Sequence, residues 1–249
     1  MNGAGSVESL WQLHLEAMAA FGFDRLLYSY TRYRNGRSVG DPQDLIVLTN
    51  LPPAHVRPYL GRGLYLQSPM IRWALENDGA CSWAWLAEKA RQGGFSPAEL
   101  KVVEFNQRMG LTCGYTISFR SLMPRAKGGL GLCARAGLSQ DDADAIWAEH
   151  GPSIVAVNNV FHLKLLSLPH AGSRKLTERQ REALQWVGDG KTAQDIALLM
   201  ELSPATVEKH LRLAREALGA ETTAQAVLKA AFYNQLFIVD SPETVVPSA

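Results

Sequence analysis

The 249-residue sequence predicts two domains of different class, an α+β domain first and then an all-α domain of four helices. Three observations predict this division. Helical and strand-like patterns alternate over residues 1–167, helical patterns alone occupy residues 175–239, and a short proline-containing segment of small residues lies between them. We therefore expect a first domain over 1–167, a linker over 168–174, a helical domain over 175–239 and a C-terminal tail over 240–249.

The first domain begins with a helix and then alternates strands with helices. Apolar residues at helical spacing predict a helix over 6–21, and β-rich runs predict strands over 25–33, 44–49, 113–120 and 129–135. Between the strand pairs, helical patterns occupy 52–60, 68–76 and 96–110. Ser139 and Asp142 begin a last helix, which we expect Pro152 to interrupt before it resumes to about residue 166. This order favours an α-β-α sandwich around a central antiparallel sheet.

Two short helices with complete start signals lie in the second domain. Thr192, with Asp195 three residues later, forms a capping box that begins the first of them. Ser203 can cap the next helix, and Pro204 follows at the first helical position, where its missing N–H costs nothing. A break at Glu201-Leu202 separates the two, so this segment predicts a helix–turn–helix.

The second of these helices has two different faces. One face is apolar and consists of Val207, Leu211, Ala214 and Leu218. The other face is polar and partly basic, and it consists of Glu208, Lys209, Arg212, Arg215 and Glu216. A helix of this kind at the end of a helix–turn–helix has the geometry that enters a major groove of DNA. A pair of packed helices without a nucleic-acid partner has the same local pattern, so that alternative stays open for this segment alone.

Composition and charge exclude several classes of protein. Residues 173–236 contain nine basic and eight acidic residues, so DNA binding there depends on the local placement of cations.

Three cysteines, Cys81, Cys113 and Cys133, lack metal-ligand spacing and cannot all pair. No apolar run approaches the roughly 20 residues of a membrane span, and the first residues lack a signal-peptide pattern. We expect a cytoplasmic protein with no catalytic constellation, metal or cofactor, and therefore not an enzyme.

With these features the second domain resembles the helix–turn–helix domain of LuxR-type transcription factors of the quorum-sensing group. The positions that carry the resemblance are Leu176, Thr177, Arg179, Leu184, Gly190-Lys191, Ile196-Ala197, Ser203, Thr206-Val207, His210, Leu218 and Ala226-Val227. Gln180, Ala217 and Thr223 depart from the family pattern, which has glutamate, lysine and arginine there. The resemblance implies that these departures weaken an internal salt bridge and one or two phosphate contacts.

The first domain resembles the family's autoinducer-binding domain, which encloses an acyl-homoserine lactone between a sheet and helices. The stretch LPPAHVRPYLGRGLYLQSPM, followed by CSW, carries the resemblance, together with Met109-Gly110-Leu111. Tyr59, Pro69 and Trp83 match the family pattern, whereas His55 stands in place of its tryptophan and Ser68 in place of its aspartate. The resemblance implies a ligand site that contains Leu51, His55, Tyr59, Ser68, Trp83 and Gly114.

The two departures in this site change its chemistry. In the family, the aspartate accepts a hydrogen bond from the ligand amide and the tryptophan donates one to the lactone carbonyl. Ser68 is neutral and shorter, and an amide left unpaired in a buried site costs about 1–3 kcal/mol, which is roughly a tenfold to hundredfold loss of affinity. The resemblance, read with His55 and Ser68, therefore favours a non-standard small molecule, or no obligatory ligand. A simpler reading of Ser68 is that it caps the helix that begins at Pro69.

Two kinds of DNA contact are expected from the second domain. Lys191 and Thr192 stand where phosphate contacts occur, at the start of the first helix. Lys209 is suited to a base edge, Arg212 to a base or a phosphate, and Glu208 to a cytosine amino group or to solvent alone. Ser203, Thr206 and Arg215 complete the predicted DNA-binding residues.

The partners expected from these features are double-stranded DNA, a small-molecule signal and a second copy of the chain. One recognition helix makes few base contacts, so a homodimer on a palindromic promoter site is expected. The small apolar residues Ala226, Val227, Ala230 and Ala231 can pack against the second copy or within their own domain. The alternative function is that of an orphan regulator, which pairs with other regulators and blocks them without an obligatory ligand.

Overall fold

The computed structural model describes residues 6–34, 39–40, 44–168 and 175–236 and divides the chain into two compact units. The division falls between Lys164 and Leu165. Residues 169–174 of the expected linker and the whole expected tail, 240–249, lie outside the described residues. Each unit is therefore considered separately.

The first unit is built on a five-stranded sheet in which every recorded pair of strands is antiparallel. Its strands are β1 (Phe23–Thr31), β2 (Ile46–Thr49), β3 (Gly79–Ser82), β4 (Gly114–Phe119) and β5 (Lys127–Ala134), in the order β2-β1-β5-β4-β3. The predicted central antiparallel sheet is confirmed. The sequence pattern missed β3, because its residues Gly-Ala-Cys-Ser include none that favour strands by β-branching or an aromatic ring.

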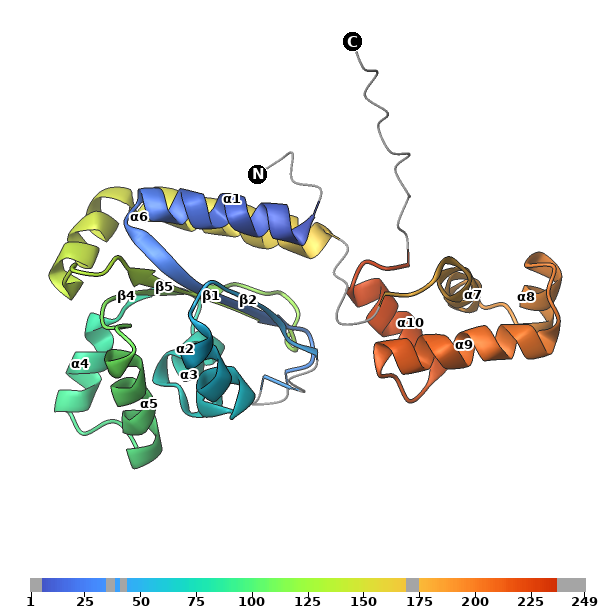
Figure 1. Ribbon diagram of the computed structural model, residues 1–249, viewed down its shortest axis with the longest axis horizontal. Coiled ribbons are helices and arrows are strands. Elements are labelled where there is room, and N and C mark those ends of the chain that lie inside the picture. Colours follow the sequence, from blue (N-terminus) through green and yellow to red (C-terminus); the bar gives the residue numbers. More distant parts are fainter. Residues whose placement is uncertain (1–5, 35–38, 41–43, 169–174, 237–249) are drawn as a thin grey trace, which may run out of the picture. The chain divides into compact units, whose positions relative to one another are not determined.

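Helices cover both faces of this sheet, as expected for an α-β-α sandwich (Figure 1). Two long helices, α1 (Val7–Ala20) and α6 (Gln140–Ser167), cover one face. The other face carries short elements: α2 (Pro53–Val56), a π-helical turn (Arg57–Gly61), a 3₁₀ turn (Leu64–Gln67), α3 (Pro69–Glu76), α4 (Ala84–Arg91) and α5 (Pro97–Arg108). Helix α4 was not predicted from the sequence.

One predicted break is wrong. Helix α6 runs without interruption over 28 residues, although Pro152 lies inside it. Proline removes one backbone donor and crowds the preceding turn, at a cost of about 3 kcal/mol. The C-terminal part of α6 offsets that cost because Ile154, Asn158 and Phe161 are fully buried there. The packing of α6 against the rest of the first unit therefore outweighs the tendency of Pro152 to break the helix.

The two faces of the sheet differ in the size of their side chains. Strand residues alternate between faces, and large residues such as Tyr28, Leu130 and Leu132 point toward α6, where Tyr28 contacts Phe161 and His162. Most residues that point to the opposite face are small, namely Ser29, Thr116, Ser118, Gly129 and Gly131, although Leu27 also lies on that face. Small residues leave space between the sheet and the short helices.

The second unit contains the four predicted helices, α7 (Glu178–Gly188), α8 (Ala193–Leu199), α9 (Pro204–Leu218) and α10 (Thr223–Phe232). Helix α9 contacts each of the other three. Its buried residues are Val207, Leu211, Ala214 and Leu218, the apolar face that the sequence predicts. Ala226 and Ala230 of α10 are fully buried, and α10 packs on α7 and α9, so this part of α10 belongs to the core of its own domain.

Candidate ligand cavity and nucleic-acid interface

A cavity of about 240 Å³ lies between the small-residue face of the sheet and the short helices. Leu51, His55, Tyr59, Ser68 and Trp83 all line it, so the structure brings together five of the six predicted ligand-site residues. Apolar side chains from α3, α4 and α5 form much of the remaining wall, including Met70, Ile71, Leu86, Ala87 and Val103. An apolar cavity with a few polar groups is the usual form of a small-molecule site.

Gly114, the sixth predicted residue, does not line the cavity. It begins β4 with φ +152°, and a Cβ atom there would lie 2.0 Å from the carbonyl oxygen of Leu132. Its backbone N–H donates to Gln140 Oε1, at 2.9 Å. Glycine is therefore required at this position by strand pairing, and its predicted ligand role is corrected to a backbone role.

Ser68 stands at the N-cap of α3, but its side chain makes no capping hydrogen bond. The residue is 4 % exposed and lines the cavity. Burial raises the pKa of Tyr59 to about 12, and a hydrogen bond with Ser68 limits this rise. The capping explanation of Ser68 is therefore wrong, since its side chain caps no backbone N–H of α3.

His55 is 1 % exposed and contacts two aromatic rings. Its ring centroid is 4.8 Å from that of Tyr59 and 5.2 Å from that of Phe105. Nε2 lies 2.9 Å from Oδ1 of Asn106 on α5. Burial lowers the pKa of His55 below its usual value, although Asn106 acts in the other direction. The imidazole is therefore neutral at pH 7.

Two cations reach the cavity wall, and both have partners elsewhere. The guanidinium of Arg25 donates to the carbonyl oxygens of Gly110 and Ala134 and pairs with Asp24. The ammonium of Lys127 donates to Asp78 Oδ1 at 2.6 Å. The polar groups that line the cavity are therefore either neutral or already paired.

Trp83 is fixed from two sides. Its indole Nε1 donates to Thr116 Oγ1 at 2.9 Å, on the floor of the cavity. The preceding residue, Ser82, donates to Asp144 Oδ1 at 2.7 Å. The same oxygen accepts from Tyr115 Oη at 2.6 Å and from Gln140 Nε2 at 2.9 Å. The N-terminal part of α6 thereby holds the cavity wall next to Trp83.

Several polar residues of the cavity were not predicted from the sequence. Asn106, Thr116 and Ser29 line it from α5, β4 and β1. For the two strand residues a signal was present, because a small polar residue between buried aromatic or aliphatic neighbours marks the open face of a strand. No pattern in the sequence distinguishes Asn106 from a surface residue of an amphipathic helix.

In the second unit, the helix–turn–helix has the predicted caps. Thr192 and Asp195 form a capping box on α8, with Thr192 Oγ1 accepting from the Asp195 backbone N–H. Ser203 Oγ accepts from the Thr206 backbone N–H and lies 2.8 Å from Thr206 Oγ1. Glu201 occupies the left-handed region, with φ 55°, which sets the direction of the turn. Lys191, Thr192 and Ser203 are exposed, and Thr206 is half-buried.

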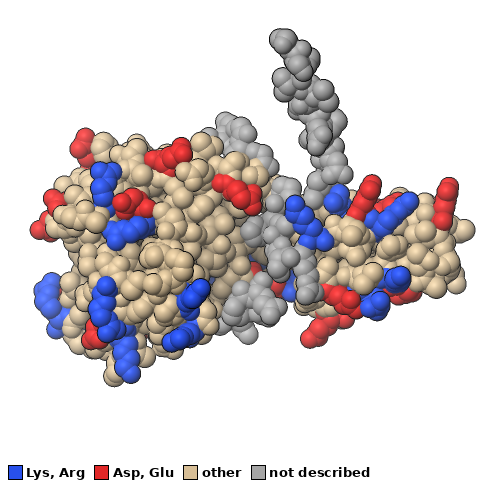
Figure 2. All heavy atoms as spheres, viewed as in Figure 1, with Lys and Arg blue, Asp and Glu red and all other residues tan. Residues whose placement is uncertain are grey.

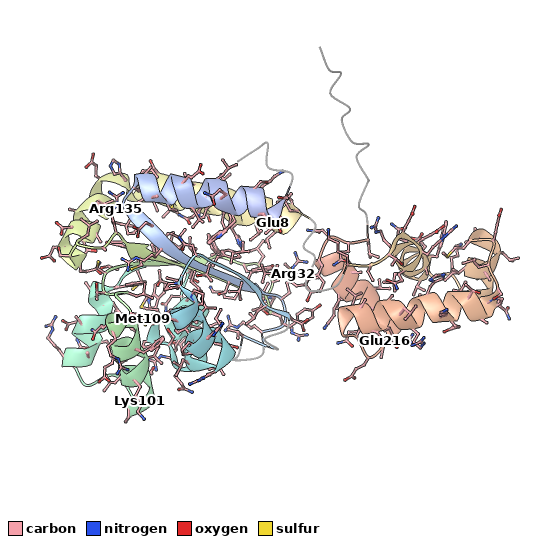
Figure 3. All side chains as sticks on the ribbon, in the orientation of Figure 1. Glu8, Arg32, Lys101, Met109, Arg135 and Glu216 are labelled. Carbon is pink, nitrogen blue, oxygen red and sulfur yellow. The ribbon has the colours of Figure 1, made fainter. Side chains whose placement is uncertain are left out.

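Helix α9 presents most of its predicted polar face to solvent. Glu208, Lys209 and Arg212 are exposed. Arg212 Nη1 pairs with Glu216 Oε1 at 2.5 Å, and Figure 3 shows Glu216 on the side of α9 away from α7. Arg215 differs from the prediction, since it is half-buried and donates to Thr223 Oγ1 of α10 at 2.8 Å. Its contact is therefore with its own domain.

The surface charges are mixed. Figure 2 shows Lys and Arg side chains interspersed with Asp and Glu on the face in view. Within the described residues, no group of three His, Cys, Asp or Glu side chains is placed to hold a metal ion. None of the described helices is both long and apolar enough to span a membrane.

Comparison with known families identifies both units. Residues 6–165 match the profile of the autoinducer binding domain, and residues 174–230 match that of the bacterial regulatory proteins of the LuxR family. The transcriptional activator AhyR of Aeromonas hydrophila is 23 % identical over 209 residues, which cover 81 % of this chain and 78 % of AhyR. LuxR of Aliivibrio fischeri is 24 % identical over 191 residues, covering 75 % of this chain and 73 % of LuxR.

Solved structures have the same fold. SdiA of Escherichia coli in complex with octanoyl-rac-glycerol aligns with a TM-score of 0.50 and 18 % identity, over 93 % of this chain and 90 % of SdiA. CepR2 of Burkholderia cenocepacia, described as an N-acylhomoserine lactone dependent LuxR family transcription factor, has a TM-score of 0.50 and 17 % identity, over 66 % of this chain and 88 % of CepR2. With a cavity in the first unit and a helix–turn–helix in the second, the chain belongs to the LuxR family of transcriptional regulators.

Proposed function

We propose that this protein binds double-stranded DNA as a homodimer in the cytoplasm and that a small molecule in its first domain regulates this activity. The observation that carries the proposal is the exposed row Glu208, Lys209 and Arg212 on the second helix of a capped helix–turn–helix. Lys191 and Thr192, both exposed at the start of α8, support phosphate contacts beside it. The first domain supplies the cavity for the signal.

Selection of bound duplexes from a randomised DNA pool tests this proposal and defines the operator in the same experiment. We expect a palindromic consensus. Replacement of Lys209 or Arg212 by alanine should weaken the complex, and a lost phosphate contact should reduce the slope of log K against log salt concentration by about 1. Lys101 is the control, since it lies on α5 and Figure 3 shows it pointing outward, so Lys101→Ala should leave DNA binding unchanged.

The proposed ligand is not a standard acyl-homoserine lactone. Ser68 is engaged with Tyr59 and carries no charge, so it cannot make the charge-assisted hydrogen bond that a carboxylate would make to a ligand amide. A thermal-shift titration with N-octanoyl homoserine lactone should therefore give a small change in melting temperature. A large stabilisation at concentrations near the protein's own would refute this part of the proposal.

A protein-binding antagonist is the second candidate function. It is favoured by one observation, the pairing of Arg212 with Glu216, because a paired guanidinium is less accessible to a phosphate. The DNA selection separates the two functions. Enrichment of no sequence at any salt concentration would support the antagonist, and a salt-sensitive complex that Lys209→Ala weakens would support the DNA-binding regulator.

A further inference from the structure

We propose that Asn106 is the residue that selects the ligand, by donating a hydrogen bond from its side-chain amide to a carbonyl oxygen of a neutral molecule, and that His55 holds this amide in position. This inference rests on the proposed ligand-sensing function and specifies its chemistry. The juxtaposition that carries it is the contact of the two side chains, His55 from α2 and Asn106 from α5, at the wall of one cavity.

The hydrogen bond between the two residues fixes which atoms can reach a ligand. Asn106 Oδ1 can only accept, so Nε2 of His55 carries the proton across the 2.9 Å contact. The Asn106 amide nitrogen then points away from His55 and keeps both of its protons. Among the described residues it has no hydrogen-bond partner, and Asn106 itself lines the cavity. The amide therefore presents a donor to whatever fills the cavity.

The orientation of this donor is held rigidly. His55 is buried and its ring contacts those of Tyr59 and Phe105, which restricts its movement. Because burial keeps His55 neutral, it has one ring proton, and the contact with Asn106 uses it. A pre-organised donor binds more tightly than a mobile one, since less conformational entropy is lost on binding.

The other cavity groups indicate a neutral ligand with an acceptor oxygen. Arg25 and Lys127 are already paired, so an anionic ligand would find no free cation among these two side chains. Thr116 Oγ1 accepts from Trp83, which leaves its own hydroxyl proton as a second donor. Donors that face a mostly apolar cavity suit an uncharged ester, amide or ketone, because a buried donor without an acceptor is costly.

A pair of probes that differ in one carbonyl group tests the inference. Methyl octanoate and methyl octyl ether are both neutral and have chains of equal length, but the ether lacks the carbonyl oxygen. Isothermal titration calorimetry with the full chain should show that the ester binds about threefold to tenfold more tightly than the ether, as expected for one neutral hydrogen bond. Equal affinities, or no binding of either probe, would overturn the inference.

Three variants assign the preference to specific atoms. Asn106→Asp keeps an oxygen for His55 but replaces the donor by an acceptor, so it should abolish the preference for the ester. His55→Phe keeps an aromatic ring in contact with Tyr59 and Phe105, and we expect it to lower the ratio of ester to ether affinity while the affinity for the ether stays the same. A structural defect would weaken both probes equally. Lys101→Ala, on the same helix outside the cavity, should keep the full preference.

Failure of this inference is distinguishable from failure of the proposed function. The DNA selection with Lys209→Ala depends on the second domain and needs no ligand. If DNA binds but the ester and the ether bind equally, the regulator proposal stands and the role of Asn106 is wrong. If the preference is seen and no DNA is bound, the first domain is a small-molecule receptor with a different output.

Discussion

At the scale of single residues, two buried histidines make the stability of the first domain depend on pH. Burial lowers the pKa of His14 to about 4 despite the nearby Asn158, and it lowers the pKa of His162 to about 4 as well. The unfolded chain holds these protons with a pKa near 6.5, so between pH 6.5 and 4 the unfolded state binds more protons than the folded state. The free energy of unfolding should therefore fall as pH drops through this window, by up to about 3 kcal/mol for each histidine.

The first prediction concerns His14, which stacks on Phe161 with ring centroids 3.9 Å apart. Neither of its ring nitrogens has a hydrogen-bond partner among the described residues. His14→Phe should therefore raise stability at pH 7 and remove about half of the loss between pH 6.5 and 4. Urea unfolding at pH 7 and pH 4.5 measures both effects. His14→Gln is the control, because it removes the titration without removing a buried polar group, and an unchanged pH dependence in both variants would contradict the assignment.

Single residues also mark the limit of prediction from sequence. The apolar and polar faces of α9 followed from helical spacing, and burial confirmed Val207 and Leu211 on the inner side. The role of Ser68 did not follow, because a serine before a proline at a helix start has the same sequence whether it caps the helix or faces a cavity. The half-burial of Arg215 depends on Thr223 in the next helix, a tertiary contact that periodicity cannot indicate.

At the scale of elements, the N-terminal part of α6 is joined to β3 and β4 by the carboxylate of Asp144. Burial acts to raise the pKa of Asp144, but hydrogen bonds from Tyr115, Ser82 and Gln140 hold it below its usual value. Asp144→Ala would leave the Tyr115 hydroxyl, in a residue only 7 % exposed, without this acceptor. We predict a loss of about 2–4 kcal/mol in the free energy of unfolding, measured by chemical denaturation.

A double-mutant cycle tests the cause of this loss. Asp144→Asn keeps an acceptor oxygen and should cost less than half as much as Asp144→Ala. In the Asp144→Ala background, Tyr115→Phe removes the unpaired hydroxyl and should cost little, whereas alone it should be destabilising. Additive effects of the two substitutions would show that the hydrogen bond contributes nothing.

The elements themselves were predictable to different degrees. Capping signals placed α8 and α9 well, because Thr192 and Ser203 each make the expected cap. Helix α6 was wrongly divided at Pro152, because a local penalty of a few kcal/mol is smaller than the burial gained by a 28-residue helix on a sheet. Strand β3 forms only through its pairing with β4, so its short sequence carries no signal of its own.

At the scale of the whole molecule, the proposed homodimer needs a surface on which two copies meet. Helix α10 has an exposed apolar stripe of Ala224, Leu228 and Ala231, spaced four and three residues apart. Leu228 is 60 % exposed, whereas Ala226 and Ala230 pack inside the domain. Of the four small residues named for dimerisation from the sequence, only Ala231 is exposed, whereas Val227 is half-buried and Ala226 and Ala230 are buried. Burying the exposed stripe against a symmetry-related copy would place two recognition helices in one complex.

The final prediction follows from this stripe. Leu228→Glu should shift the protein toward monomer in sedimentation velocity runs, because the symmetric contact would bring two carboxylates together in an apolar interface. Affinity for a selected palindromic duplex should fall at least tenfold, while the melting temperature of the monomer stays the same because the side chain is exposed. Leu122→Glu is the matched control, since Leu122 is 93 % exposed in the first unit and outside the stripe. A dimer that survives Leu228→Glu with full DNA affinity would exclude α10 as the contact, because a hydrophobic interface centred on Leu228 could not accommodate two buried charges.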